Sequence, residues 1–394
     1  MAGRKVYRTK TGKRKQNTAK VFQTIFIILL LAVLVYLGYI LAGPLFRFLN
    51  RSTEITPQGW TPPVTTEVTV STVTKLQDNT DTQTGGTVLD PAATKTLTGY
   101  TLPISALSSK ESLSAAITDA QSSGFTAAIV PLKLAGGEVT YKTTAEMAQS
   151  AGVVTGTMTA KEIADVITEA GLIPVCIINL LEDNSPFTDY RGVYKFASDD
   201  ARWYDNNPAR GGKPWISPFD NDAKDYLKSL STEVSSAGFK NVIFDGLVFP
   251  PFRNSDLGYI GSSVSSPDRY KALISLWDEV SGAARDNGAT PMLMISADGA
   301  AAKTAEVLHP EMLGDIETVI KYDVSTFPTT IIVNGNETIL TDMNFSQRFT
   351  FIMGLVRNNA GDMTIIPYIT GATPEVISEA VDKAVEIGFS SYFV

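Results

Sequence analysis

The chain has one cysteine and one histidine among its 394 residues, and this scarcity excludes several kinds of chemistry. Cys176 alone cannot form an intramolecular disulfide, and His309 alone cannot build a multi-histidine metal site. A Ser-His-Asp mechanism would have to use His309, which lies just before Pro310, where a surface or helix-end role is the simpler interpretation. No Gly-x-Gly-x-x-Gly follows the first predicted strand, so the usual dinucleotide-binding signal is missing. We therefore expect no cofactor and no metal ion.

Acidic side chains are absent from residues 1–51, which carry ten of the 33 basic ones. The rest of the chain holds the other 23 basic side chains against 41 acidic ones, a net charge of −18. Because phosphate binding needs a basic surface, nucleic acid is not expected as a partner of this acidic part. The basic arm, residues 1–20, is explained by the segment that follows it.

No charge interrupts residues 21–46, a run long enough to cross a bilayer, which takes about 20 apolar residues. Backbone groups in lipid must be satisfied internally, so the segment is predicted to be one transmembrane helix. A cleavable signal peptide is the alternative, although the apolar run is long and Ala42-Gly43 is followed at once by Pro44. The basic arm predicts a single-pass cell-membrane protein with a cytoplasmic N-terminus and an extracellular C-terminal domain.

Threonine dominates the next segment, with fifteen between residues 52 and 98 and little aromatic content. Such a composition cannot bury enough apolar surface to offset chain entropy. We predict a disordered, Thr-rich stalk over residues 47–98.

From residue 99 to residue 394, β-branched apolar runs alternate with helical patterns, and a glycine often ends the helix before the next strand. The predicted strands are 101–106, 126–132, 173–179, 240–245, 290–296, 316–322, 363–369 and 390–394. The predicted helices are 109–123, 159–170, 221–237, 267–287, 345–359 and 374–387, with a short one near 301–308. Eight strands with crossover helices favour a closed (β/α)8 TIM-type barrel without its eighth helix, and an open doubly wound α/β sheet is the alternative.

Polar residues gather where the predicted strands end, which is where parallel barrels form their sites. Asp245 ends a buried apolar strand, and its carboxylate either faces a polar cleft or caps a loop. Asp298 follows the fifth strand and is expected to approach Asp245 across the barrel mouth. Two carboxylates in unequal environments are what glycoside hydrolysis requires. The other polar residues at or just beyond the strand ends are Ser105, Lys133, Asn179, Glu182, Asp183, Ser296, Lys321, Tyr322, Asp323, Tyr368 and Thr370.

A long polar loop, residues 198–222, carries aromatic side chains that suit either stacking on sugar rings or packing over the barrel end. Trp203 and Trp215 are therefore candidate glycan-binding residues, and packing is the stronger interpretation for Trp215. Lys133 is a candidate positioning residue or a solvated strand-end lysine. Asp183, Tyr322, Asp323 and Tyr368 complete the residues expected to support substrate binding.

Residues 213–250, "KPWISPFDNDAKDYLKSLSTEVSSAGFKNVIFDGLVFP", resemble a glycoside hydrolase-like domain family of unknown function from bacterial cell-surface proteins. The resemblance covers most of residues 99–394 and includes "ISADG" at 295–299 and the closing helix and strand. It implies a barrel distantly similar to the alpha-amylase clan, acting on carbohydrate. The matching residues are Trp215, Pro218, Gly238, Phe239, Phe244, Asp245, Phe249 and Pro250.

This sequence departs from the family pattern at polar positions. Where the family has a Tyr directly after the matching Asp, this chain has Gly246, and where the family has an Arg nearby, this chain has Val248. This chain has Pro131 where the family has an Asp near the end of the second strand, and Ile177 where the family has an Arg in the third strand. The family's Trp-Leu-Gln in the seventh strand is replaced here by "PYIT". Two functions follow as hypotheses. One is a membrane-anchored hydrolase of a cell-envelope or extracellular glycan, with Asp245 as nucleophile or base and Asp298 as acid. The other is a catalytically inactive glycan-binding or scaffolding module of the cell envelope. The sequence identifies no protein partner for either function.

Overall fold

The structure is a computed structural model that describes residues 96–394 except 186–190, 304–307, 315, 334 and 361–362. The predicted basic arm, the predicted transmembrane helix over 21–46 and nearly all of the predicted stalk lie outside the described residues. Within the described part of the chain, no helix is both long and apolar enough to cross a bilayer.

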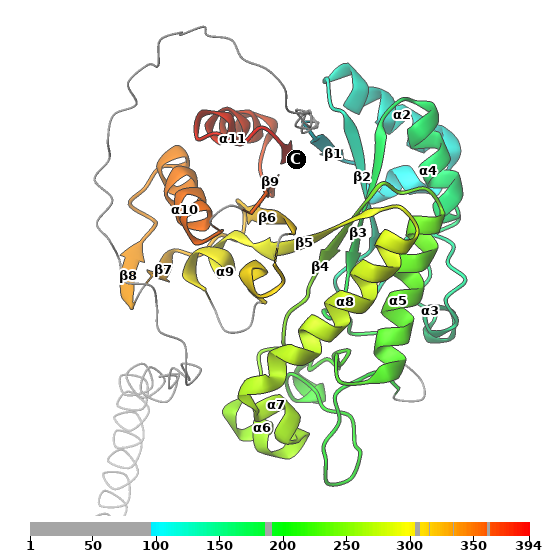
Figure 1. Ribbon diagram of the computed structural model, residues 1–394, viewed down its shortest axis with the longest axis vertical. Helices are drawn as coiled ribbons and strands as arrows, with labels where there is room; N and C mark the ends of the chain where they lie inside the picture. The colour runs from blue at the N-terminus through cyan, green and yellow to red at the C-terminus, as the bar shows by residue number, and fades with distance from the viewer. Residues whose placement is uncertain (1–95, 186–190, 304–307, 315, 334, 361–362) are drawn as a thin grey trace, which may run out of the picture. The chain divides into compact units, whose positions relative to one another are not determined.

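Eight parallel strands close into a barrel, which confirms the predicted fold class (Figure 1). Around the barrel the order is β1-β10-β9-β6-β5-β4-β3-β2. Each barrel strand therefore lies beside the barrel strands that precede and follow it in the chain, and β10 closes the barrel against β1. The strands are β1 (Thr98–Thr101), β2 (Ala127–Lys133), β3 (Ile173–Asn179), β4 (Asn241–Asp245), β5 (Thr290–Ser296), β6 (Glu317–Asp323), β9 (Ile365–Thr370) and β10 (Tyr392–Phe393).

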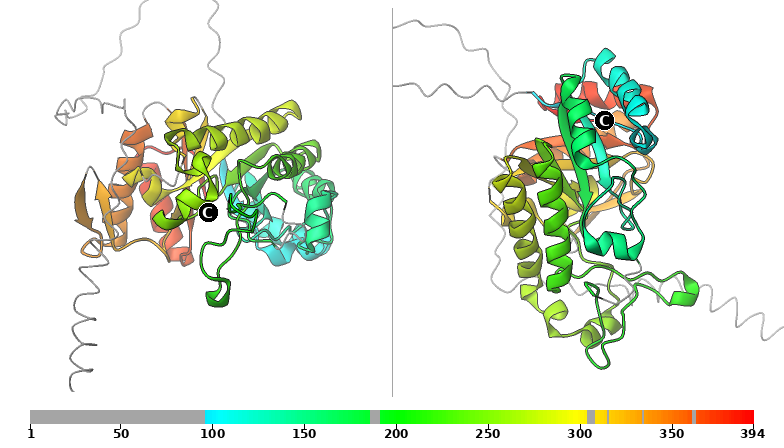
Figure 2. Two further views of the ribbon diagram at one scale, coloured as in Figure 1. Left: turned by 90° about the horizontal axis from the view of Figure 1, so that it is seen from below. Right: turned by 90° about the vertical axis from the view of Figure 1, so that its right-hand side faces the viewer.

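The main helices lie outside the strands, as the views in Figure 2 show, and side chains of the two pack into a buried core. They are α2 (Lys110–Ser122), α4 (Ala160–Glu169), α5 (Asn221–Ser236), α8 (Tyr270–Asp286), α9 (Ala297–Ala302), α10 (Phe345–Ala360) and α11 (Pro374–Glu386). Five of the glycines predicted to end helices, at 124, 171, 238, 288 and 388, have φ between 76° and 111°. This left-handed conformation closes a helix and is favourable for glycine.

Some elements differ from the prediction. The first strand is β1 and not 101–106, because Pro103 lacks an N–H and residues 104–108 form the 3-10 helix η1 (Ile104–Ser108). The helix expected near 301–308 is α9, which begins earlier because the Ser296 side chain accepts a hydrogen bond from the Gly299 N–H. It ends at Lys303, whose φ is 52°.

The structure contains a β-hairpin that the sequence analysis did not predict. It lies between β6 and α10, at the edge of the domain in Figure 1. Its strands are β7 (Thr330–Val333) and β8 (Asn336–Ile339), which pair antiparallel. An Asn-Gly dipeptide between two β-branched runs is the usual sequence signal for such a hairpin.

Side chains on alternate strand residues form two apolar layers. One face of each strand fills the barrel interior, with residues such as Val175, Ile243, Met292 and Val319. The other face packs against the helices and forms the larger core. This period of two decides which strand-end side chains reach the barrel mouth.

Two long connections pack together on one side of the barrel mouth. The β3–α5 connection contains the 3-10 helix η2 (Pro208–Arg210), and the β4–α8 connection contains α6 (Asn254–Ile260), α7 (Ser262–Ser265) and η3 (Pro267–Arg269). Between β2 and α4, a shorter connection contains α3 (Glu146–Ala151), and η4 (Pro310–Met312) precedes β6.

Candidate active site

Five polar side chains belong to the inward face of the strands at their carboxyl ends. Strand register pairs Asn179 with Asp245, and it pairs Lys321 with both Ser296 and Tyr368. Each of the first four lies two residues beyond an interior apolar residue of its own strand, and Tyr368 itself belongs to the interior layer. These four are Asn179, Asp245, Ser296 and Lys321. The pleat therefore directs Asp245 and Lys321 toward the same mouth of the barrel.

A cleft of about 290 Å³ opens at this mouth, a volume near the lower end of typical ligand pockets. Four carboxylates and one ammonium group line it: Glu182, Asp245, Asp298, Asp323 and Lys321. Val248, Met294, Phe327 and Pro328 add apolar surface to its walls. The cleft thus brings together Asp245 and Asp298, as expected from the sequence, and it also contains Asp323.

Asp245 is held at both carboxylate oxygens. Its Oδ1 accepts a hydrogen bond from the Gly246 N–H at 2.8 Å, and its Oδ2 lies 3.7 Å from Lys321 Nζ. Burial raises the pKa of Asp245, Lys321 opposes that rise, and Glu182 adds to it. In return, Asp245 raises the pKa of Lys321 and favours the charged ammonium.

Glu182 enters the cleft from a tight turn after β3. Asn179 Nδ2 donates to Glu182 Oε2 at 2.9 Å, and the Glu182 N–H donates to Asn179 Oδ1 at 3.2 Å. The Gly136 N–H donates to the Glu182 carbonyl. Glu182 and Lys321 were both visible in the sequence as polar residues near strand ends, but their roles depend on contacts between strands.

Lys133 and Asp183 form a buried ion pair that supports this turn. Their Nζ and Oδ2 atoms lie 2.9 Å apart, and neither side chain is exposed. Lys133 also donates to the carbonyls of Asn179, at 2.8 Å, and Leu180, at 3.4 Å. Both residues were expected to contact substrate, but the structure places them below the surface, where they bind each other.

Asp298 and Asp323 differ in their hydrogen bonding. Asp323 Oδ1 accepts hydrogen bonds from the Ser325 N–H and hydroxyl and from the Thr326 N–H. Burial alone would raise the pKa of Asp323, but these hydrogen bonds outweigh burial and lower it. The side chain of Asp298, in the first turn of α9, forms no hydrogen bond or ion pair with any described residue.

Residues 100–292 match the model of a family described as "Putative glycosyl hydrolase domain". The described domain is a glycoside hydrolase-like TIM barrel. The glycoside hydrolase domain of PgaB (BpsB) from Bordetella bronchiseptica is similar to it, with a TM-score of 0.54 and 12% identity over 76% of this chain and 92% of that chain. At this identity the likeness shows the fold alone.

Two further solved structures overlap with this chain less well. The α-galactosidase TtGalA from Thermus thermophilus has a TM-score of 0.46 and 11% identity, covering 76% of this chain and 57% of that chain. The GH20 exo β-N-acetylglucosaminidase from Vibrio harveyi has a TM-score of 0.42 and 11% identity, covering 69% of this chain and 41% of that chain. No curated protein sequence matches the chain.

The two tyrosines proposed for the glycoside hydrolase-like site point away from open solvent. Tyr322 is fully buried on the outer face of β6, where it stacks on Phe327 at 4.5 Å and accepts a hydrogen bond from Arg348 Nε. Tyr368 lies in the barrel interior and accepts a hydrogen bond from Thr101 Oγ1 at 3.0 Å. Tyr322 follows Lys321 directly, so the pleat turns it away from the cleft.

The two tryptophans of the predicted aromatic loop belong to the packed connections beside the cleft. Trp203 is fully buried against Tyr194 and Phe252, and its Nε1 donates to Asp256 Oδ2 at 3.0 Å. Trp215 is half-buried and donates to Asp205 Oδ2 at 3.0 Å. The structure therefore leaves no face of Trp203 for stacking on a sugar.

The departures from the family pattern have a structural counterpart at Gly246. Its φ is +68°, and a Cβ there would lie 2.6 Å from Asn179 Oδ1. A tyrosine at this position would displace the amide that orients Glu182. Val248 lines the cleft, and Ile177 fills the barrel interior.

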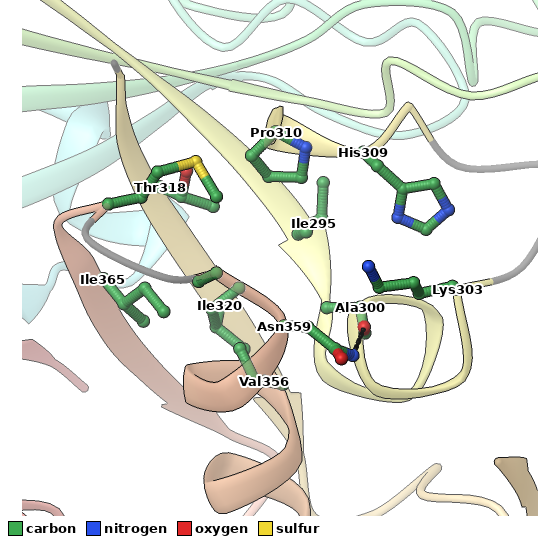
Figure 3. Close-up of a pocket in the computed structure, with 12 residues that line it drawn as sticks. Ile295, Ala300, Lys303, His309, Pro310, Thr318, Ile320, Val356, Asn359 and Ile365 are labelled. Carbon is green, nitrogen blue, oxygen red and sulfur yellow. Dashed lines mark hydrogen bonds between the residues drawn. The ribbon is translucent and has the colours of Figure 1, made fainter. Parts of the chain in front are cut away.

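A second cavity lies between β5, β6, α9 and α10 (Figure 3). Figure 3 shows Asn359 donating to the Ala300 carbonyl at its edge, next to Lys303 and His309. Its volume of about 20 Å³ is close to that of one water molecule, so it cannot admit a sugar. Among the described residues, no three His, Cys, Asp or Glu side chains are arranged to hold a metal ion.

Proposed function

We propose that the barrel hydrolyses a glycosidic bond in a cell-envelope or extracellular glycan, with Asp245 and Asp298 as its two working carboxylates. The observation that supports this proposal is that both carboxylates line one open cleft at the carboxyl ends of the strands. Glycosidases need one carboxyl group that carries a proton and one that is ionised.

The contacts of the two residues suggest their roles. Burial raises the pKa of Asp245, and Lys321 counteracts this rise by favouring the ionised form that a nucleophile or a base needs. The Asp298 side chain lines the same cleft and forms no hydrogen bond or ion pair with a described residue, so we assign it the role of acid by its position opposite Asp245. Asp323 is a poorer acid, because its hydrogen bonds stabilise the carboxylate.

A non-catalytic glycan-binding module is the second candidate, and Val248 is the observation that favours it. The resembled family has an arginine where this chain places an apolar side chain in the cleft. Without that positive charge, the cleft loses a group able to tune a catalytic carboxylate. The apolar walls and Phe327 would then serve binding alone.

Turnover and binding by matched variants distinguish these functions. The full-length chain in detergent, Asp245→Asn and Asp298→Asn would be incubated with fractionated cell-wall and capsular glycans, and released reducing ends and bound glycan measured. A hydrolase requires release that both variants lose by at least about 100-fold. Asp165→Asn, on the exposed Lys161–Asp165 pair of α4, is the control and should keep full release. Binding without release, unchanged in both variants, would favour the binding module.

We also propose that residues 21–46 anchor the chain in the cell membrane, with the N-terminus in the cytoplasm and the barrel outside. The uncharged run and the basic arm before it support this topology. The only native cysteine, Cys176, is buried, so introduced cysteines report accessibility alone. In intact cells a membrane-impermeant maleimide should label Thr82→Cys and not Thr9→Cys. Labelling of Thr9→Cys without permeabilisation would contradict the topology.

A further inference from the structure

We propose that Lys321 is a positioning residue that holds Asp245 oriented and ionised at the barrel mouth. This inference rests on the proposed role of Asp245 in glycan chemistry. No motif in the sequence pairs the two residues, which are 76 positions apart and come from β4 and β6.

The geometry across β5 carries the proposal. Both residues belong to the inward faces of their strands, and β5 lies between the two strands in the barrel. Lys321 Nζ reaches to 3.7 Å from Asp245 Oδ2, while the Gly246 N–H holds Oδ1 at 2.8 Å. With one oxygen fixed by the backbone and the other facing an ammonium group, the carboxylate has a defined direction in the cleft.

The side chains of Lys321 and Asp245 are partly exposed, which suits groups that act in the cleft and not a contact of the packed core. The Lys321 side chain is 39% exposed and that of Asp245 is 20% exposed. By contrast, the Lys133–Asp183 pair nearby is fully buried. Losing Lys321 therefore leaves the packed core intact while it removes the positive charge from the cleft.

Among the titratable groups near Asp245, Glu182, which enters from the turn after β3, adds to the rise in the pKa of Asp245. Asp298 from α9 and Asp323 from β6 line the same cleft, and Tyr368 from β9 lies close to both Asp245 and Lys321. Burial also raises the pKa of Asp245. Lys321 is the only ammonium or guanidinium group lining the cleft among the described residues, and together with the Gly246 N–H it counteracts the effects of burial and Glu182 on Asp245.

The pH dependence of the interaction has a definite sign. Lys321 lowers the folded-state pKa of Asp245 below the value that burial and Glu182 would give it. Its pairing with Asp245 therefore adds stability at pH values where Asp245 is ionised, and this stability is lost as pH falls through the folded-state pKa. A contact that only packs the lysine stem would not show this loss.

A double-mutant cycle tests the pairing without any glycan. The full-length chain, Lys321→Met, Asp245→Asn and the double variant would be unfolded thermally between pH 4 and pH 8. We expect a coupling of about 1–3 °C in Tm at pH 8 that decreases as the pH falls toward 4. No coupling at pH 8, or the same coupling at every pH, would overturn the proposal.

Two further variants keep the result interpretable. Lys224→Met removes the Lys224–Glu279 pair between α5 and α8, and it should show no coupling with Asp245→Asn. Lys321→Arg keeps a positive charge and should retain most of the coupling. If Lys321→Met fails to fold, the same cycle with Lys321→Gln gives the deciding comparison.

Activity, where present, gives a separate readout. In a protein that releases sugar, Lys321→Met should move the acidic limb of the kcat/KM profile upward by about one pH unit, and Lys321→Arg should restore it. An unmoved limb would overturn the positioning role. A chain that shows the thermal coupling but releases no sugar would instead refute the hydrolase function and leave the Lys321–Asp245 pairing standing.

Discussion

Lys133 Nζ lies 2.9 Å from Asp183 Oδ2, and both side chains are completely buried. The same ammonium group binds the carbonyls of Asn179 and Leu180, so one lysine fixes the turn that carries Glu182 into the cleft. Asp183 in turn accepts hydrogen bonds through Oδ1 from the Ser185 N–H and hydroxyl. A pair that the sequence presents as a binding candidate thus supports the cleft from beneath.

Replacing Lys133 with Met should lower the free energy of unfolding by about 3–5 kcal/mol, because it leaves the Asp183 charge buried and unpaired. Urea unfolding of the full-length chain, followed by tryptophan fluorescence, measures the change. The double variant Lys133→Met with Asp183→Leu should recover most of the loss, since it removes the isolated charge. A double variant no more stable than Lys133→Met would show that the pair is not the source of the effect.

Gly246→Ala should destabilise the barrel more than Gly124→Ala. Both glycines have positive φ, +68° and +80°, so each substitution costs about 1–2 kcal/mol in backbone strain. Only at Gly246 does the new Cβ meet a neighbour, the Asn179 side chain at 2.6 Å, whereas Gly124 has open space. Urea unfolding of both variants should show the larger loss at Gly246. Equal losses would mean that Asn179 moves aside freely.

Asp256 should stabilise the two packed connections at neutral pH and not at acid pH. Burial would raise its pKa, but hydrogen bonds from Trp203, Arg253 and Ser255 outweigh burial and lower it. A carboxylate with a lowered folded-state pKa contributes stability above its unfolded pKa of about 3.9, and this is lost as pH falls through the folded-state value. Asp256→Asn should therefore cost about 1–2 kcal/mol at pH 7, and this cost should shrink as the pH falls below about 3.9 toward the folded-state pKa.

The measurement for Asp256 is the difference in Tm between wild type and variant across this pH range. Asp165→Asn, on the exposed pair with Lys161, is the control and should change Tm little at any pH. A constant difference for Asp256→Asn from pH 7 to pH 3 would refute the electrostatic explanation.

The cleft should bind neutral glycans in preference to anionic ones. Four carboxylates face one ammonium group there, so a uronate or phosphate approaches a surface of its own sign. We expect a neutral oligosaccharide to bind at least about tenfold more tightly than its carboxylated counterpart in 20 mM salt, with a smaller ratio in 500 mM salt because salt screens the repulsion. Glu182→Gln should reduce the ratio. Equal affinity at low salt would show that glycans bind elsewhere.

Periodicity made the barrel predictable from sequence. Runs such as "PVCIIN" and "PMLMIS" are apolar on both faces, which is typical of a parallel strand covered on both sides, and β3 and β5 have the predicted bounds. Glycines predicted to end helices showed where each helix stops and the next strand begins. Pro103 shows where this reasoning failed, because a local break moved β1 three residues earlier than predicted.

The site was predictable only in part. Asp245 was recognisable because a carboxylate after a buried strand needs an explanation, and the cleft contains it together with Asp298. Tyr322 could have been separated from its neighbours, because adjacent strand residues point to opposite faces. The burial of Trp203 depends on Asp256, 53 residues away, and no local pattern reveals that contact.

By itself, the sequence determined the alternation of parallel strands and helices and the strand ends where polar groups gather, because both follow from local periodicity and from residues that end helices and strands. It favoured a closed barrel over an open sheet, and the tertiary structure decided between them. Tertiary structure alone decided which polar groups meet. It buried Lys133 with Asp183, and it brought Lys321 across β5 to Asp245. The physical reason is that charge interactions depend on distances of a few ångströms between residues far apart in the chain, and barrel closure sets those distances.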